Sequence, residues 1–265
     1  MKKLGMIFLC AMLCVASACK RFGAPRAEAS LESALSKNTA EIKFPIINFH
    51  HVGPIATNAT EKQVTYTTTP EVLEAELKYL KDHGYRTVLL DVLIDAFDKG
   101  VPLPPKAVAL TFDDGWRDQF RNAFPLLKKY GMVGSFFIPV GWVGHSKVMG
   151  WTELRELADA GMGVGTHGYL HWHFDTIHGW ALDREIVQTK KTMEQHLGRP
   201  VDVIAYPGGY YNAEAIGVVK AAGYKLALTT KHRIGQSAAL RFEVGRFHGG
   251  NSLETVTDPL TSNSY

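Results

Sequence analysis

Cysteine is absent from the part of the chain that could use it for disulfide bonds in a folded domain. All three cysteines, Cys10, Cys14 and Cys19, fall within the first nineteen residues of the 265-residue chain. The remaining residues can therefore form no disulfide among themselves. The chain also lacks any basic tract longer than a dipeptide, and its formal net charge is only +3. It thus has no electrostatic footprint of a nucleic-acid-binding protein, and we expect no such partner.

Internal repeats and low-complexity segments are absent as well, which excludes solenoids and fibrous folds. Hydrophobic residues make up 46% and charged residues 21% of the chain, a balance typical of globular proteins. The length suits one sizeable domain and leaves little room for a second core.

The amino terminus has the layout of an export signal. Lys2-Lys3 precedes an uncharged, largely apolar run that is too short to span a bilayer. We predict a signal peptide over residues 1–19 in preference to a buried helix. Cys19 follows Ala-Ser-Ala, which resembles the lipoprotein cleavage box, although Ala16 stands where leucine is usual. Lipidation of Cys19 would anchor the protein to a membrane surface, and simple signal cleavage is the alternative.

A tether is expected over residues 20–40 and one folded domain over residues 41–265. Within that domain, short apolar runs alternate with helical patterns. The strand candidates are residues 44–49, 86–90, 107–112, 132–140, 163–166, 201–206, 224–229 and 242–247. Helices are predicted to begin at Thr69-Pro70, at Thr152, near Leu182 (as far as Gly198) and at Asn212. This alternation predicts an α/β fold, a distorted (β/α) barrel of about seven parallel strands in a single domain.

Two adjacent acids end one of the strand candidates. The segment TFDDG (residues 111–115) places Asp113 and Asp114 where an apolar strand stops. Carboxylates there are costly unless they bind a cation or take a proton, and reactive groups of barrels gather at such strand ends. Gly115 would let the chain turn so that both acids reach the barrel mouth. A helix cap or an Asp-Gly turn is the structural alternative.

Two histidines follow another strand candidate. The segment HGYLH (residues 167–171) carries His167 and His171 four residues apart. They can converge on one metal ion if the chain turns helically after the strand. His173 is two residues further on and is treated as incidental. The acid pair and the histidine pair together favour a metal site over isolated surface or core residues.

These two segments, followed by AYPGGY (residues 205–210), resemble in their order the polysaccharide deacetylase family, the NodB-homology domain or carbohydrate esterase family 4. The resemblance covers residues 44–246. The stretches PIINFH (residues 45–50) and 103–115 resemble the branch that contains bacterial poly-N-acetylglucosamine deacetylases.

The resemblance implies a role for each matching residue. Asp113 corresponds to the general base, and Asp114, His167 and His171 correspond to the metal ligands. Gly208 would donate a backbone N–H to the oxyanion. The ion would lower the pKa of a water molecule that attacks the acetamide carbonyl. Zinc is expected, and cobalt, nickel or iron also suits two histidines and an aspartate.

The remaining assignments are less direct. The family's third motif usually begins with an arginine that contacts the base, but this chain has Ala205 there, and Arg246 is the substitute or else part of a surface ion pair. His248 is the candidate acid, although the family's Leu-His motif has no clean match. His50 matches a position of this branch, with substrate binding and a structural hydrogen bond as alternatives. Substrate contacts are expected from Tyr206, Pro207 and Tyr210, and packing beneath the loop is the alternative for the two tyrosines.

The expected function is metal-dependent removal of N-acetyl groups from N-acetylglucosamine units of an extracellular or cell-wall polysaccharide, foremost poly-N-acetylglucosamine, by an exported monomer. Peptidoglycan N-deacetylation is the first alternative. A catalytically silent carbohydrate-binding lipoprotein and a small-molecule amidase stay open. A site that acts on a polymer needs an open groove with exposed aromatic side chains, whereas a small-molecule amidase needs a closed pocket.

Overall fold

The computed structural model describes residues 40–261. The predicted signal peptide, the candidate lipid-bearing Cys19 and nearly all of the tether lie outside the described residues, so these predictions stay predictions. Among residues 40–261, no helix is both long enough and apolar enough to span a membrane.

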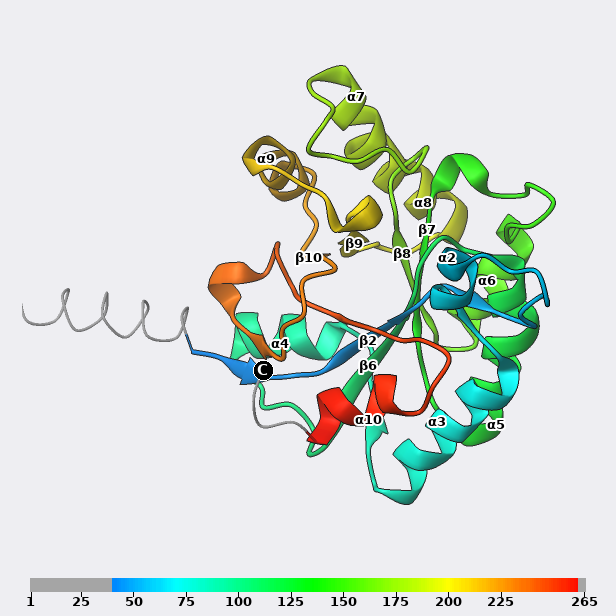
Figure 1. Ribbon diagram of the computed structural model, residues 1–265. Helices are drawn as coiled ribbons and strands as arrows, with labels where there is room; N and C mark the ends of the chain where they lie inside the picture. Colours follow the sequence, from blue (N-terminus) through cyan, green and yellow to red (C-terminus); the bar gives the residue numbers. More distant parts are fainter. Residues whose placement is uncertain (1–39, 262–265) are drawn as a thin grey trace, which may run out of the picture. The chain divides into compact units, whose positions relative to one another are not determined.

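Within the described part of the chain, one eight-stranded parallel sheet organises the domain (Figure 1). Its strand order is β10-β9-β8-β7-β6-β2-β12, and β5 pairs with the start of β6. The strands are β2 (Ile46–Phe49), β5 (Arg86–Thr87), β6 (Ala107–Phe112), β7 (Ser135–Ile138), β8 (Gly163–Thr166), β9 (Val203–Ala205), β10 (Leu226–Leu228) and β12 (Phe247–His248). Two short pairs accompany it: β1 (Ile42–Lys43) with β11 (Gly235–Gln236), and β3 (His51–Val52) with β4 (Thr67–Thr68).

The segment of residues 241–248 draws the two edges of the sheet together. The backbone N–H of Thr229, just beyond β10, donates to the Val244 carbonyl oxygen at 2.8 Å. Three residues later, Phe247 of β12 pairs with Ile47 of β2 at the opposite edge. The sheet therefore curls into a distorted (β/α) barrel, which confirms the expected fold class.

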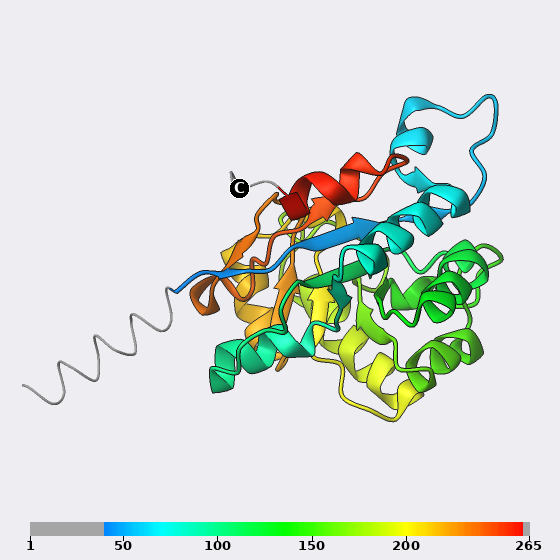
Figure 2. The same ribbon diagram turned by 90° about the horizontal axis from the view of Figure 1, so that it is seen from below.

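Helices lie around the outside of the curled sheet (Figure 2). They are α2 (Glu61–Thr65), α3 (Pro70–Asp82), α4 (Asp91–Lys99), α5 (Phe124–Tyr130), α6 (Trp151–Asp159), α7 (Trp180–Asp183), α8 (Thr189–Leu197), α9 (Ala213–Ala221) and α10 (Glu254–Thr261). Short 3₁₀ turns are η2 (Val140–Trp142), η4 (Pro207–Gly209) and η5 (Ala238–Leu240), and π-helical turns are η1 (Gln119–Ala123) and η3 (Arg184–Gln188).

Side-chain caps explain where several helices begin. The Thr69 hydroxyl accepts the Val72 N–H, with Pro70 at the first helical position, and the Asn212 side chain accepts from Ala215. The prediction that Thr152 caps α6 is wrong. That helix begins one residue earlier, after Gly150, whose N–H donates to Glu153 Oε2 at 2.7 Å. The cap is supplied by Glu153, the residue after Thr152, whose carboxylate reaches back to the Gly150 N–H, and this contact does not involve the threonine hydroxyl.

Strand β6 shows how the core positions the site. All six of its residues are buried, as in parallel strands covered on both faces. Ala107 and Ala109 belong to the apolar cluster inside the barrel, together with residues of β2, β7, β9 and β10. Val108 and Leu110 pack outward against the helices. Because side chains alternate along a strand, Thr111 and then Asp113 continue the inward row. The interior thus changes from apolar to polar at the carboxyl ends of the strands.

The acid Glu76 is buried in the helical layer. Glu76 of α3 is 1% exposed, and its Oε1 accepts the Thr255 hydroxyl of α10 at 3.2 Å. Its Oε2 is buried without a hydrogen-bond partner among the described residues. Burial therefore raises the pKa of Glu76 well above its usual value, although the hydrogen bond from Thr255 opposes the shift.

We expect Glu76→Gln to stabilise the fold at pH 8 and not at pH 4. A folded-state pKa above the unfolded value gives stability that is present at low pH and lost as the pH rises through the folded-state pKa. The neutral amide removes that loss, so the free energy of unfolding should rise by about 1–3 kcal/mol at pH 8. Urea titrations at both pH values measure it, with the exposed Glu71 of α3, as Glu71→Gln, for control. An equal effect at both pH values would contradict the assignment.

Candidate metal centre

Asp113 and Asp114 reach the barrel mouth by different routes. Asp113 ends the inward row of β6, and its N–H donates to the Phe49 carbonyl oxygen at 2.9 Å. Asp114 has a φ of 73°, and Gly115 follows with 67°. The turn expected from Gly115 therefore begins one residue earlier, at Asp114 itself. Aspartate is among the few residues that enter this left-handed region readily, because its short side chain bonds locally.

His167 is aimed by a neighbouring strand. It follows β8, is buried, and its Nδ1 lies 2.8 Å from the Ala205 carbonyl oxygen of β9. That contact places the proton on Nδ1 and leaves Nε2 free to bind a cation. Burial lowers the pKa of His167, although the charge of Asp113 opposes the shift, so the neutral, ligating form is favoured.

The chain bends between His167 and His171 and does not form a helical turn there. Gly168 has a φ of 78° and His171 a φ of 61°, and no helix forms between them. The expected helical turn is therefore wrong, although the two imidazoles do converge, with ring centroids 4.8 Å apart. Trp142 stacks on His171 at 5.3 Å between centroids and limits the freedom of the ring.

Three donor atoms meet at this mouth. Asp114 Oδ1 lies 3.5 Å from His167 Nε2 and 3.3 Å from His171 Nε2, and the donor atoms of all three residues lie within 4.8 Å of one another. Ligands about 2.0–2.2 Å from a tetrahedral ion are roughly 3.3–3.6 Å apart. The two separations from Asp114 Oδ1 fall in this range, so the cluster offers a divalent transition metal two nitrogens and one carboxylate oxygen, with positions left for water and substrate.

Asp114 is held by its second oxygen. Trp116 Nε1 donates to Asp114 Oδ2 at 3.1 Å, and the Trp116 ring stacks on His51 at 4.4 Å. Burial alone would raise the pKa of Asp114. The hydrogen bond with His171 and the charge of His167 outweigh burial and lower the pKa to about 2. The carboxylate is therefore ionised and oriented across the physiological range.

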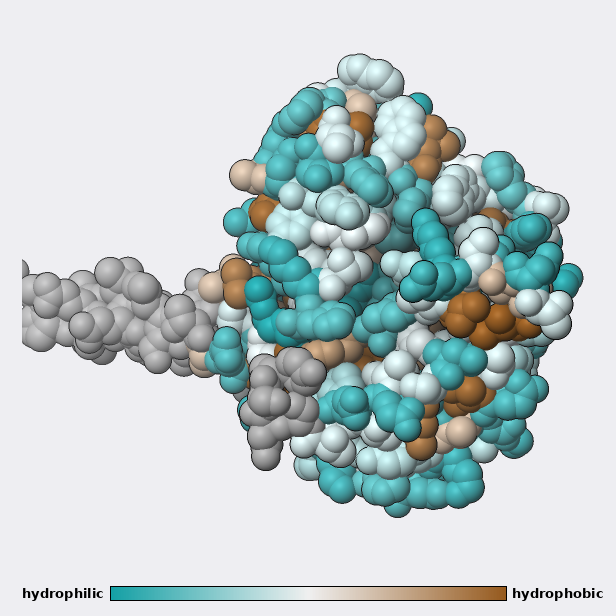
Figure 3. Space-filling model, viewed as in Figure 1, coloured by the Kyte–Doolittle hydropathy of each residue, from teal (hydrophilic) through white to brown (hydrophobic). Residues whose placement is uncertain are grey.

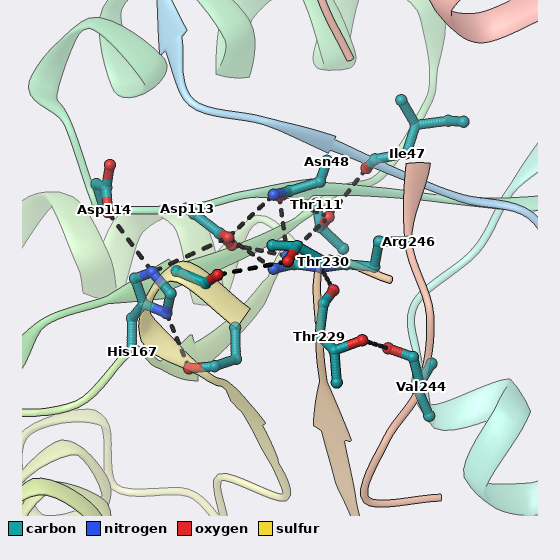
Figure 4. A network of polar contacts seen from close by, with 12 residues as sticks. Ile47, Asn48, Thr111, Asp113, Asp114, His167, Thr229, Thr230, Val244 and Arg246 are labelled. Atoms are coloured by element: carbon teal, nitrogen blue, oxygen red, sulfur yellow. Dashed lines mark hydrogen bonds and ion pairs between the residues drawn. The ribbon is translucent and has the colours of Figure 1, made fainter. Parts of the chain in front are cut away.

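Arg246, in the segment that leads into β12, forms an ion pair with Asp113 (Figure 4). Its Nη1 and Nη2 donate to the two carboxylate oxygens at 2.8 and 2.7 Å, and Asn48 Nδ2 donates to Oδ2 at 3.0 Å. The arginine is 1% exposed, which rules out the surface ion pair considered as its alternative. Burial would raise the pKa of Asp113, but Arg246 and His167 hold it well below its usual range.

His50 and His248 lie on the far side of this network. Their rings are 5.9 Å apart, and each contacts the Tyr66 ring. His248 Nε2 contacts the Thr65 carbonyl oxygen at 2.8 Å. Burial lowers the pKa of His50 to about 4, although the charges of Asp113 and Asp114 oppose the shift. Among the described residues, neither imidazole hydrogen-bonds to Asp113.

The turn at residues 206–210 divides into a buried part and an exposed part. The Tyr206 side chain is fully buried, and its hydroxyl donates to the Phe242 carbonyl oxygen at 3.1 Å. It packs beneath the loop, so the expected substrate contact is wrong for this side chain. Pro207 is buried too. Gly208 has a φ of 61°, and Tyr210 is 50% exposed and stacked on His173 at 4.4 Å.

Sequence reasoning missed Glu185 and Asn48. Glu185, on η3, is fully buried and accepts the N–H of Tyr169 at 2.7 Å and that of Leu170 at 3.1 Å. It thus braces the loop between the two histidines. A Cβ on Gly168 would lie 2.7 Å from Glu185 Oε2, so the carboxylate also explains this glycine.

Each missed residue left a weak signal. Glu185 stands three residues after the core residue Leu182, on an otherwise apolar helix face. Asn48 is a lone amide in the inward row of an apolar strand.

A cavity of about 410 Å³ opens at the other end of the barrel, where Ser135 and Gly163 begin their strands, and is separate from this site.

Comparison with known proteins gives a consistent result. A family described as polysaccharide deacetylase matches residues 100–227. The Bacillus subtilis protein YxkH, whose name describes it as a polysaccharide deacetylase, is 27% identical over 199 residues. The match covers 75% of this chain and 68% of YxkH. The poly-β-1,6-N-acetyl-D-glucosamine N-deacetylase of Staphylococcus aureus (strain MSSA476) is 24% identical over 63% of this chain, and the match spans 62% of that enzyme.

Solved structures share the fold. The Streptococcus pyogenes deacetylase PplD, in complex with acetate, superposes with a TM-score of 0.77 at 24% identity and covers 84% of this chain and 100% of its own. IcaB from Ammonifex degensii superposes with a TM-score of 0.72 at 25% identity, covering 83% of this chain and 97% of its own.

We expect Glu185→Gln to weaken metal binding at the triad by about 10–100-fold, because an amide offers the loop one acceptor oxygen in place of two. Competition of the purified protein with a chromophoric chelator for Co²⁺ gives the affinity, and the cobalt absorption spectrum reports the ligand geometry. Glu156→Gln, an exposed site on α6, is the matched control. An unchanged affinity and spectrum would refute the bracing role.

Proposed function

We propose, since this chain belongs to the polysaccharide deacetylase family, that it hydrolyses the N-acetyl groups of N-acetylglucosamine units in a polymer. Poly-N-acetylglucosamine is the first candidate substrate, by analogy with the Staphylococcus aureus relative. One observation carries the proposal. An arginine-bound carboxylate stands beside the donor triad, with Asp113 Oδ2 4.0 Å from His167 Nε2. A silent binding protein has no need of an ionised acid oriented in this way.

Asp113 serves as the general base. The carboxylate is ionised at neutral pH because Arg246 and His167 lower its pKa, and the two-pronged grip of Arg246 fixes the direction of its oxygens. It takes the proton of the water molecule that attacks the acetamide carbonyl carbon. A divalent ion held by Asp114, His167 and His171, zinc first and cobalt, nickel or iron also suitable, would acidify that water and polarise the carbonyl.

The rest of the reaction falls to the surrounding loops. The Gly208 N–H, in the turn after β9, is the donor proposed for the oxyanion, since its φ of 61° shapes the loop at the barrel mouth. His248 is proposed to protonate the leaving amine as the C–N bond breaks. Tyr210, exposed beside Gly208, and the partly exposed His50 are the proposed substrate contacts.

Location follows from the amino terminus. We propose that residues 1–19 direct export and that Cys19 carries a lipid, which would keep the domain as a monomer at a membrane surface facing its polymer. Peptidoglycan is the alternative polymer, because the same chemistry acts on β-1,4-linked units.

Released acetate tests the proposal. The purified protein is incubated with N-acetylglucosamine oligomers of β-1,6 and β-1,4 linkage, with and without a chelator, and then with zinc, cobalt or nickel restored. We expect chelator-sensitive release with preference for the β-1,6 series. Preference for the β-1,4 series would move the substrate to wall-type polymers. No release from either series, with metal shown to be bound, would overturn the proposal.

We expect Asp113→Asn to keep bound metal and lose turnover by about 10²–10⁴-fold, because only the proton acceptor is removed. His167→Ala should lose both metal and turnover. Metal content by elemental analysis and acetate release are measured on the same samples. Asp82→Asn and His83→Ala, exposed residues outside the site, are the controls. Near wild-type turnover in Asp113→Asn would show that the base is another residue.

A variant of Arg246 tests the electrostatic part of the mechanism. Without the guanidinium, burial raises the pKa of Asp113, so a growing fraction of the base is protonated as the pH falls. The ratio of kcat/KM for Arg246→Gln to that for the wild type should therefore decrease from pH 8 to pH 5. Arg246→Lys keeps the charge and should show a ratio that is lower than one but flat with pH. Parallel profiles for both variants would contradict the assigned role.

A further inference from the structure

Exposed aromatic side chains are concentrated around the candidate site. Among residues 40–261, the exposed large apolar side chains are Val64, Tyr66, Val101, Trp172, Trp180 and Tyr210. Tyr66 contacts His50 and His248, and Tyr210 stacks on His173. The two tryptophans both lie between β8 and α8: Trp172 directly follows His171, and Trp180 begins α7. Large exposed apolar groups that gather in one region mark a binding surface, whereas scattered ones need no explanation.

The two tryptophans are organised by one cation. The Arg184 guanidinium carbon lies 4.7 Å from the Trp172 ring centroid, 5.6 Å from that of Trp180 and 5.5 Å from that of Tyr169. The Nε and Nη2 atoms of Arg184 are buried and have no hydrogen-bond partner among the described residues. The aromatic faces therefore hold the guanidinium, and the guanidinium fixes the rings in turn.

The aromatic side chains around Arg184 are connected through Glu185 to the loop that carries His167 and His171. Arg184 is followed directly by Glu185, which bonds the N–H groups of Tyr169 and Leu170, and Arg184 Nη2 lies 3.8 Å from Glu185 Oε1. Trp172 is the neighbour of the ligand His171. A group stacked on the tryptophans is thus placed at a set position relative to the reacting centre.

The exposure of Trp180 is unusual for its size. Its side chain is 71% exposed, although an indole offers a large apolar area and prefers burial. Figure 3 shows that the surface of this part of the domain is mostly hydrophilic, with apolar patches that are small and separate. A membrane-binding face would be apolar over a broad area, so the setting favours a ligand that has both apolar and polar sides.

We propose that Trp172 and Trp180, fixed by Arg184, form a subsite that stacks a sugar ring of the polymer next to the residue being deacetylated. A pyranose presents C–H groups on its flat faces and hydroxyls around its edge, so it matches an indole face within a polar surface. This inference rests on the proposed function and extends it: the enzyme recognises its substrate as a chain of linked hexosamine units.

The test compares oligomers of different length. Trp180→Ala and Trp180→Tyr are assayed for acetate release on β-linked N-acetylglucosamine oligomers of two to five units. Val101→Ala, an exposed apolar residue in the connection that leads into β6, is the matched control and should leave all rates unchanged. We expect kcat/KM for Trp180→Ala to fall about 5–10-fold on the pentamer, with a loss that shrinks as the oligomer shortens, and Trp180→Tyr to recover most of it.

A binding measurement keeps the inference separate from the proposed reaction. Calorimetric titration of the pentamer into the wild type and into Trp180→Ala should show the same 5–10-fold loss of affinity, whether or not acetate is released. Acetate release with equal losses at every length, or with none, would overturn the subsite. If the wild type releases no acetate, the proposed reaction fails. The subsite then survives only if the pentamer binds and Trp180→Ala weakens that binding.

Discussion

The buried ion pair between Asp113 and Arg246 is the interaction on which the site and the closure of the barrel both depend. The guanidinium also donates to the Thr229 carbonyl oxygen at 2.9 Å and to Asn48 Oδ1 at 2.8 Å. It therefore connects the end of β10, β2 and the end of β6 in one polar layer. Loss of one member of such a pair leaves an unpaired buried charge and costs about 3–5 kcal/mol. The same contact that orients the base thus helps to hold the two edges of the sheet together.

The polar layer exists because the barrel interior changes character along its axis. Below it, Ala107, Ala109 and Ile46 fill the space with apolar atoms, and above it lie Asp114, His167 and His171 at the open mouth. A carboxylate in the apolar part would be protonated, whereas at the mouth alone it would be solvated and mobile. The layer places Asp113 between these two extremes, dry enough to be fixed and close enough to the mouth to accept a proton.

Strand ends made the four central residues predictable from the sequence. TFDDG and HGYLH each follow an apolar run, and parallel strands bring such ends to one mouth, so Asp113, Asp114, His167 and His171 could be grouped without a structure. The path between the histidines could not be predicted, because a positive φ at His171 is a local exception imposed by its surroundings. Arg246, the partner of Asp113, is 133 residues away in sequence. It could be named only through the family resemblance, and the structure was needed to decide between this contact and a surface ion pair. The prediction that Tyr206 contacts the substrate was wrong because the sequence does not show whether an aromatic side chain packs into the core beneath the loop or faces the substrate.

The π-helical turn η3 directs two adjacent residues to different places: Arg184 contacts the tryptophans, and Glu185 contacts the loop between the two histidines. Between α7 and α8 the helix widens over Arg184–Gln188, and the Thr189 hydroxyl donates to the Arg184 carbonyl oxygen at 3.1 Å within the widened turn. Such a bulge is equivalent to one extra residue in an α-helix, and one residue corresponds to about 100° of rotation. Deleting it would restore a regular helix and rotate Arg184 and Glu185 away from Trp172 and the histidine loop together. A single-residue change in chain length would therefore separate this helix from both surfaces, although every side chain on it could remain.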